Sequence, residues 1–456
     1  MMQRFVMTRR SMLFSLLGLI LTALLTAWGC GSGGSGSYTD PNSLITTTKA
    51  TTIVGAAQLK AWIDEGKLNA TFGSKDRVVI VSPSTDTDWY VKGHIPGAVR
   101  WDTSELAENG RTEGVSIAAS MMPSGAMMDG IIKRLGIDEN TTIVISLPKS
   151  STLYYQTLIY WDLRYWGFPK ERIKILNGGD DAWEVAGYDI SKDPTDRYTS
   201  STYSVAYNSG LKTGLRYNVG QVIAKIDETI ADPTVLNSWQ IIDVRGFKPS
   251  PTAAGEFYLT NALRMTSYTQ FFPNSVNNEA TRNKLFPTKA QLESLFQTSK
   301  IYLPSDVSGT PTGTISTSKK TIVTCTASSS ASPSFALFDA VLDVPDGQIT
   351  MYDGSATQWN YYSYALLKAK YTTATDAQIY AWAFDNPANL RAQGTFPTTI
   401  PSSANFSFNA ANLANGPGVA GMTDQIDRGN QAYIDFIKLN SNTNQNTGTG
   451  GSQQGC

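Results

Sequence analysis

Cys325 is the side chain best placed in this sequence to act as a nucleophile. It ends the mostly apolar run Thr321–Cys325, which predicts a buried strand, and a short loop of small residues follows it. A loop that leaves a parallel strand and opens a helix points several backbone N–H groups into one concavity, and the helix N-terminus adds partial positive charge. Such donors favour a thiolate or persulfide over the neutral thiol, so we expect sulfur nucleophilicity at Cys325 without a histidine base.

The loop itself supplies the predicted substrate-binding residues. Its three serine hydroxyls can donate to an anion, but no cation lies next to Cys325 in the sequence, so Lys149, Arg245 or Lys248 would have to supply charge through folding. The alternative is that Cys325 is only a small buried residue, as free cysteines often are. The predicted substrate-binding set is Thr326, Ala327, Ser328, Ser329, Ser330 and Ala331.

The remaining cysteines and the histidine give no sign of a metal centre. The chain has 3 cysteines, Cys30, Cys325 and Cys456, and 1 histidine, His94, and it lacks a Cys-x-x-Cys-His motif. We therefore expect no metal site and no cofactor. Cys456 ends a flexible tail, where it could resolve a Cys325 persulfide or simply oxidise, and both roles stay open.

The N-terminus has the order of an export signal. Arg9 and Arg10 precede an apolar run from Met12 to about Leu25, which is short for a membrane span, and small residues precede Cys30. The segment resembles a bacterial lipobox, which implies a lipid anchor on Cys30 and a place in the cell envelope. The lack of Asp after Cys30 favours the outer membrane, facing the periplasm or the surface. An uncleaved anchor helix is the alternative, and the export route stays open.

Composition and periodicity predict the fold class. With 456 residues, 41% of them hydrophobic, the chain is long enough for two domains, and a net charge of -1 argues against nucleic-acid binding. Apolar runs at Arg77–Val81, Thr142–Ile145 and Lys174–Leu176 predict strands, and Leu153–Tyr165 has helical periodicity. Strands that alternate with helices predict an α/β fold with mainly parallel sheets.

Segments of the chain recur in the same order. Thr142–Ser146 matches Thr321–Cys325, and Leu176–Trp183 matches Tyr352–Trp359, which indicates a duplication. We therefore predict a signal peptide 1–29, a lipidated tether 30–52, a first domain 53–200, a linker 201–235, a second domain 236–422, and a C-terminal part 423–456 with a short helix and a disordered tail from residue 440.

Three of these segments resemble a known family. Lys92–Val99, with its Gly-His-Ile-Pro-Gly-Ala string, Leu176–Gly179 and Tyr352–Ser355 are similar to the signature segments of tandem rhodaneses, the thiosulfate and mercaptopyruvate sulfurtransferases. The resemblance covers about residues 70–190 and 236–362. It implies two tandem rhodanese-like domains, each a mainly parallel sheet covered by helices on both faces.

The resemblance also implies an activity. Ser146 stands at the cysteine position of the first copy, which would be inactive, and Cys325 stands at that of the second. In the implied reaction Cys325 takes the outer sulfur of a small sulfur-containing anion as a persulfide and passes it to a thiol or cyanide acceptor. The loop departs from the family, because it holds neither a basic residue nor a glycine.

Several other residues are expected to have structural roles only. We predict that His94 fixes a turn, that Trp183 and Trp359 close the two cores, and that Asp243 and Arg245 form an ion pair.

Two other functions stay open. One is a non-catalytic binding scaffold beside an envelope protein partner, such as an outer-membrane respiratory or electron-transfer assembly. The other is oxyanion binding in the loop. The long insertions at about 271–318 and 361–421 favour the scaffold.

Overall fold

A computed structural model describes most of the chain between residues 51 and 446. The expected signal peptide, the tether with Cys30, the tail with Cys456, Lys248 and nearly all of the insertion at 361–421 lie outside the described residues. No helix in the described part is long and apolar enough to cross a membrane. The described residues are 51–114, 116–118, 120–193, 200–245, 259, 261–265, 267–276, 284–303, 310–359, 407–408 and 424–446.

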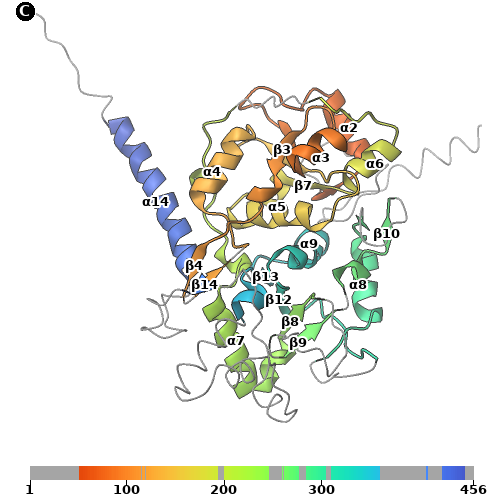
Figure 1. The fold of residues 1–456 in the computed structure, drawn as a ribbon, viewed down its shortest axis with the longest axis vertical. Helices are drawn as coiled ribbons and strands as arrows, with labels where there is room; N and C mark the ends of the chain where they lie inside the picture. The colour runs from red at the N-terminus through yellow and green to blue at the C-terminus, as the bar shows by residue number, and fades with distance from the viewer. Residues whose placement is uncertain are drawn as a thin grey trace, which may run out of the picture. The chain divides into compact units, whose positions relative to one another are not determined.

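The first copy is built on a parallel sheet of five strands in the order β1-β7-β6-β2-β3 (Figure 1). The predicted strands and the helix at Leu153–Tyr165 are confirmed, with α5 beginning one residue later. The elements are β1 Ile53–Val54, α2 Ala56–Asp64, β2 Val78–Ser84, α3 Asp86–Val91, β3 Val99–Asp102, α4 Gly125–Arg134, β6 Thr142–Ile145, α5 Tyr154–Tyr165, β7 Ile173–Leu176 and α6 Gly179–Val185.

Helices cover both faces of this sheet because its central strands are apolar on both sides. Successive residues of a strand point to opposite faces. Val79 and Ile143 belong to a core with residues of α4 and α5, whereas Ile80 and Val144 belong to a second core with residues of α2, α3 and α6. The run of buried residues in β2 and β6 is therefore a property of a doubly covered parallel sheet.

The second copy repeats the arrangement with four parallel strands in the order β13-β12-β8-β9. Ile322 of β12 pairs with Ile241 of β8 and Thr350 of β13, and residues of α7 pack on the face opposite to α8 and α9. The elements are α7 Val219–Ala231, β8 Trp239–Asp243, β9 Ala262–Arg264, β10 Asn274–Ser275, β11 Lys284–Leu285, α8 Lys289–Thr298, β12 Lys320–Thr324, α9 Ser332–Ala336, a π-helical turn Leu337–Val341 and β13 Ile349–Met351.

The two copies meet through α5 and α9 (Figure 1). The π-helical turn after α9 places Asp339 in this contact, where it accepts a hydrogen bond from Tyr160 at 2.6 Å and pairs with Arg164 at 2.8 Å. Asp339 is fully buried, so the ion pair excludes water and joins the helices that follow Ser146 and Cys325.

The C-terminal helix α14, Gln425–Asn446, is longer than the sequence predicted. The expected disordered tail from residue 440 is wrong for its first residues, because the helix continues to Asn446. Ile426 and Ile434 are buried, and Tyr433 and Ile437 pack against the core, so the expected apolar face is confirmed. The helix lies against a small antiparallel sheet formed by β4 Arg111–Glu113, β5 Ser116–Ala118 and β14 Ser407–Phe408.

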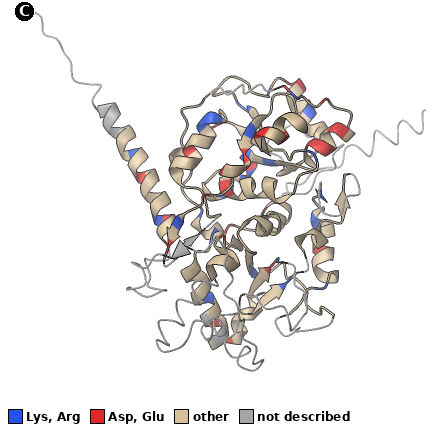
Figure 2. Cartoon of the chain, viewed as in Figure 1, with Lys and Arg blue, Asp and Glu red and all other residues tan. Residues whose placement is uncertain are grey.

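Basic and acidic side chains are interspersed over the described helices (Figure 2). This distribution agrees with the near-zero formal net charge of -1. Charge-based recognition must therefore come from individual buried or half-buried groups, and those are concentrated between the two copies.

Candidate active site

Cys325 lies directly after β12, at the carboxyl end of the second parallel sheet. The chain turns there through Ser329–Ala331 and enters α9 at Ser332, so the predicted strand, loop and helix order is confirmed. β12 lies between β8 and β13, which fixes the position of the cysteine from both sides. Ligands of open α/β sheets bind at this edge of the strands.

Three groups act on the Cys325 sulfur. The backbone N–H groups of Ala327 and Ala331 lower the pKa of its thiol, and the Ser355 Oγ lies 4.0 Å from the Sγ. The loop achieves this by a tight turn at Ser328, whose φ is +64°, a value that favours glycine. A serine is strained in this conformation.

Ser355 holds both ends of this loop. Its Oγ accepts hydrogen bonds from the N–H of Cys325 at 3.3 Å and of Ser328 at 3.2 Å, and its hydroxyl donates to the Tyr352 carbonyl at 2.8 Å. Ser355 is fully buried, with a φ of +52°. The sequence named it within a signature segment but did not predict this contact, which needs β12 and β13 side by side.

The sulfur is closed to solvent. The exposed fraction of Cys325 is 2%, and burial raises the pKa of its thiol above the ordinary value, although the N–H groups of Ala327 and Ala331 lower it. The expectation that the loop favours the thiolate is therefore wrong for the closed site, because loss of hydration outweighs the donors.

The predicted substrate-binding residues take different parts in the loop. The N–H groups of Ala327 and Ala331 lower the pKa of the thiol, and the Ala331 N–H donates to the Ser328 carbonyl at 3.0 Å. Ser328 is buried, with its hydroxyl lacking a hydrogen-bond partner among the described residues. Thr326 is exposed, and its carbonyl accepts a hydrogen bond from Thr357. The Ser329 carbonyl accepts one from Ser332. The substrate-binding roles of the loop residues, Ser330 included, stay predictions.

Two of the three cations expected to serve Cys325 have carboxylate partners. Arg245 pairs with Asp243 at 2.7 Å, which confirms the predicted ion pair. Lys149 pairs with Glu184 at 2.8 Å in the first copy, where it helps to line an open cavity of about 750 Å³. The third, Lys248, lies outside the described residues.

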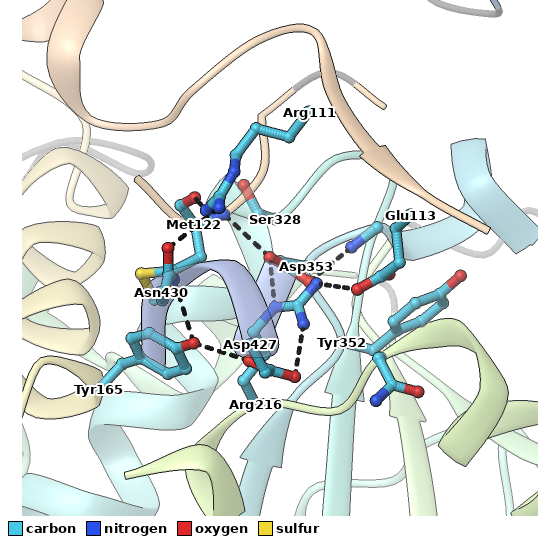
Figure 3. A network of polar contacts seen from close by, with 12 residues as sticks. Arg111, Glu113, Met122, Tyr165, Arg216, Ser328, Tyr352, Asp353, Asp427 and Asn430 are labelled. Carbon is cyan, nitrogen blue, oxygen red and sulfur yellow. Dashed lines mark hydrogen bonds and ion pairs between the residues drawn. The ribbon is translucent and has the colours of Figure 1, made fainter. Parts of the chain in front are cut away.

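A buried group of charges between the copies was missed from the sequence. The guanidinium of Arg216 pairs with Glu113 at 2.7 Å, Asp353 at 2.9 Å and Asp427 at 3.0 Å (Figure 3). We call these four residues the Arg216 cluster. It joins β4 of the first copy, the linker, the segment after β13 and α14, and Asp353 is two residues before Ser355.

Three carboxylates share the one guanidinium of this cluster. Burial raises the pKa of Glu113 to about 7, although the adjacent Arg216 lowers it. Asp427 also accepts a hydrogen bond from Tyr165 at 2.7 Å, and the Tyr165 hydroxyl accepts one from Asn430 at 3.1 Å. The first turns of α14 are thus tied to α5 and to the segment beside the cysteine loop.

Comparison with known proteins finds thiosulfate sulfurtransferases. No family model matches the chain. Thiosulfate sulfurtransferase of Rattus norvegicus is 22% identical over 315 residues, which are 65% of this chain and 89% of the relative. A putative thiosulfate sulfurtransferase of Mycobacterium tuberculosis is 28% identical over 170 residues, 37% of this chain and 52% of that protein. The chain is therefore similar to the rhodanese-like sulfurtransferases.

Solved structures are similar at lower identity. Tum1 of Saccharomyces cerevisiae has a TM-score of 0.49 and 13% identity, covering 68% of this chain and 95% of that one. The anaerobic ergothioneine biosynthesis enzyme of Chlorobium limicola has a TM-score of 0.48 and 15% identity, covering 69% of each chain. The two parallel sheets confirm the predicted α/β fold in two copies, and the curated relatives support the sulfurtransferase class.

In the first copy a serine stands at the position that the cysteine has in the second copy. Ser146 takes the position of Cys325 and donates a hydrogen bond to Asp180, a buried carboxylate on α6. Burial raises the pKa of Asp180 to about 7, although the Ser146 hydroxyl lowers it. A serine and a carboxylate that satisfy each other inside the core stabilise this copy, and Ser146 is fully buried.

The histidine and tryptophans of the rhodanese-like signature segments are structural. His94 stacks on Trp89 with ring centroids 3.7 Å apart, and its backbone pairs with Ser191. Trp183 and Trp359 belong to the buried cores of the first and second copies. The structural roles predicted for all three signature residues are confirmed. In the described part of the chain, no group of three or more His, Cys, Asp or Glu side chains is arranged to hold a metal.

Proposed function

We propose that this protein transfers a sulfane sulfur from a small anionic donor to a thiol or cyanide acceptor through a persulfide on Cys325. One observation carries the proposal: Cys325 directly follows a central parallel strand, and the N–H groups of Ala327 and Ala331 in the loop after it lower the pKa of its thiol. Fixed backbone dipoles stabilise an anionic sulfur without reorganising during the reaction. The similarity to curated thiosulfate sulfurtransferases supports the same reaction class.

The proposed cycle has two displacements. The Cys325 thiolate attacks the outer sulfur of thiosulfate, a new S–S bond forms, and the old S–S bond breaks with its electron pair leaving on sulfite. With 3-mercaptopyruvate, the C–S bond breaks instead, and the carbon fragment leaves as the enolate of pyruvate and takes a proton. The acceptor then attacks the outer sulfur of the persulfide, and the electron pair returns to the Cys325 thiolate.

The reaction needs the closed site to admit water and donor. In the closed site burial holds the pKa of the thiol high, so hydration of Cys325 favours the thiolate that attacks. The loop N–H groups that lower the thiol pKa would favour an anionic persulfide in the same way. We therefore propose that opening precedes sulfur transfer.

A binding scaffold without catalysis is the second candidate. It is favoured by the same burial, since the exposed fraction of Cys325 is 2% and its thiol pKa is raised. Under this function the site would stay closed, and the exposed surface of the protein would recognise an envelope partner instead.

Mass spectrometry separates the two functions. The purified protein is incubated with thiosulfate or with 3-mercaptopyruvate, and intact mass is used to look for one added sulfur atom. Sulfur transfer predicts the added mass in the Cys456→Ser protein and its absence in Cys325→Ser. A folded Cys456→Ser protein that gains no sulfur from either donor would support the scaffold.

We also propose that the protein is a lipoprotein of the outer membrane, anchored through Cys30. The support is the order of basic, apolar and small residues before Cys30 and the lack of Asp after it. Metabolic labelling with a fatty acid in the bacterial host, followed by membrane fractionation, should label the wild-type chain and not Cys30→Ala. Equal labelling of both chains would refute the anchor.

A further inference from the structure

Arg111 lies beside the Arg216 cluster without joining it. Its Nη1 donates to the Met122 carbonyl at 2.5 Å, and its Nη2 donates to the Asn430 side-chain oxygen at 3.0 Å. Both acceptors are neutral. Among the residues that the structure describes, no carboxylate lies within ion-pair distance of Arg111, whereas Arg216 pairs with three.

The setting of Arg111 makes an unpaired charge costly. Burial lowers the pKa of Arg111 below the ordinary value, and the nearby positive charge of Arg216 acts in the same direction. The carboxylates of Glu108 and Asp353 oppose this from a distance. A desolvated guanidinium with only neutral acceptors gains free energy when an anion replaces one of them.

Arg111 is connected to the cysteine loop by direct contacts. The Met122 carbonyl accepts from Arg111, and the N–H of the same residue donates to Asp353 at 2.9 Å. Asp353 leads through Gly354 to Ser355, whose hydroxyl reaches the Cys325 sulfur. Figure 3 shows the Arg111 side chain pointing into the network on the side where Ser328 and Asp353 lie.

We propose that Arg111 is the anion receptor of the Cys325 site and binds the sulfonate or carboxylate oxygens of the sulfur donor. The proposal rests on the function proposed above and names the group that recognises its substrate. The loop after Cys325 contains no cation, so the positive charge comes from the first copy. The planar fork of a guanidinium matches two oxygens of an oxyanion, and the anion would take the place of the Asn430 amide.

The buried Ser328 hydroxyl fits the same ligand. It has no hydrogen-bond partner in the described part of the chain, and a buried hydroxyl without a partner is rare in folded proteins. An oxyanion held between Arg111 and the loop would give this donor an acceptor. Recognition would then require both copies, since Arg111 belongs to β4 and Ser328 to the loop after β12.

Binding of thiosulfate to the Cys325→Ser protein tests the proposal without turnover. Titration calorimetry should show thiosulfate binding that weakens at least about tenfold in Cys325→Ser/Arg111→Gln, because a charge-assisted pair is lost. Cys325→Ser/Arg111→Lys should keep part of the affinity, since it keeps the charge and loses only the fork.

Arg172 offers a matched control. It is also half-buried and donates to backbone carbonyls, those of Thr141 and Asp138. Cys325→Ser/Arg172→Gln should bind thiosulfate as the parent does. Equal dissociation constants for the parent and the Arg111→Gln variant, or no thiosulfate binding by the parent, would overturn the proposal.

The mass assay keeps the two proposals apart. If the wild-type protein gains sulfur and Arg111→Gln gains it at the same rate at limiting thiosulfate, the role of Arg111 is refuted and the sulfur transfer stands. If the wild-type protein gains no sulfur, the sulfur transfer is refuted, and the calorimetry still decides whether Arg111 binds the anion.

Discussion

Replacing Ser355 by alanine removes the acceptor that holds both ends of the cysteine loop. The buried N–H groups of Cys325 and Ser328 would lose their partner, at 3.3 and 3.2 Å in the intact protein. Each unsatisfied buried donor costs roughly 1–3 kcal/mol, so we expect Ser355→Ala to lower the free energy of unfolding by about 2–4 kcal/mol. Urea denaturation followed by tryptophan fluorescence measures this change.

Comparing Ser355→Gly with Ser355→Ala separates the contribution of the hydroxyl from the cost of the left-handed backbone conformation. The φ of Ser355 is +52°, and Gly179, at the matching place of the first copy, has a φ of +56°. A left-handed conformation costs a non-glycine residue about 1 kcal/mol, so Ser355→Gly should be more stable than Ser355→Ala by that amount. An alanine variant within about 0.5 kcal/mol of wild type, or a glycine variant less stable than the alanine variant, would refute this account of the loop.

Two further predictions concern buried charges. Burial raises the pKa of Glu113 from 4.5 to about 7. Between these two pH values the folded protein keeps the proton on Glu113 whereas the unfolded chain loses it. The free energy of unfolding therefore falls as pH rises from about 4.5 to about 7. Glu113→Gln should flatten the decrease of the urea midpoint between these pH values, and an unchanged slope would contradict the assignment. Burial also lowers the pKa of Lys174 to about 7, and its ammonium nitrogen lacks a hydrogen-bond partner among the described residues. Lys174→Met should therefore gain stability over wild type as pH falls from about 10.5 to about 7 and keep a constant advantage below that, whereas Lys60→Met, at an exposed site, should show no such trend in thermal unfolding. A constant difference between Lys174→Met and wild type from about pH 7 to about pH 10 would count against a neutral buried lysine.

Local patterns were sufficient to predict the strands and the position of the cysteine. The apolar runs at β2, β6 and β12 identify doubly covered strands, and the small-residue loop after β12 places Cys325 at a strand-to-helix junction. The ion pair of Asp243 and Arg245 was predicted from their resemblance to the strand-end pair of the tandem rhodaneses. These features depend on neighbours within a few residues along the chain.

Contacts between distant segments were not predictable from local patterns. Arg216 lies in a linker rich in polar residues, where an arginine is expected to be solvated, yet it is fully buried against three carboxylates. The length of α14 was underestimated because its last residues, such as Asn440 and Asn446, are poor helix formers. Packing of its first turns on β4 and α4 supplies the nucleus from which the helix extends.

The Arg216 cluster also has a consequence for how the chain matures. Its carboxylates come from residues 113, 353 and 427, so the guanidinium acquires its final partner only after residue 427 has left the ribosome. Until then the Arg216 guanidinium has to stay hydrated, so the segments around it cannot pack into a dry interior. Chains that stop before α14 would therefore leave the interior between the copies wet and open to proteases, which makes completion of the C-terminus a checkpoint for assembly of the cysteine-bearing half.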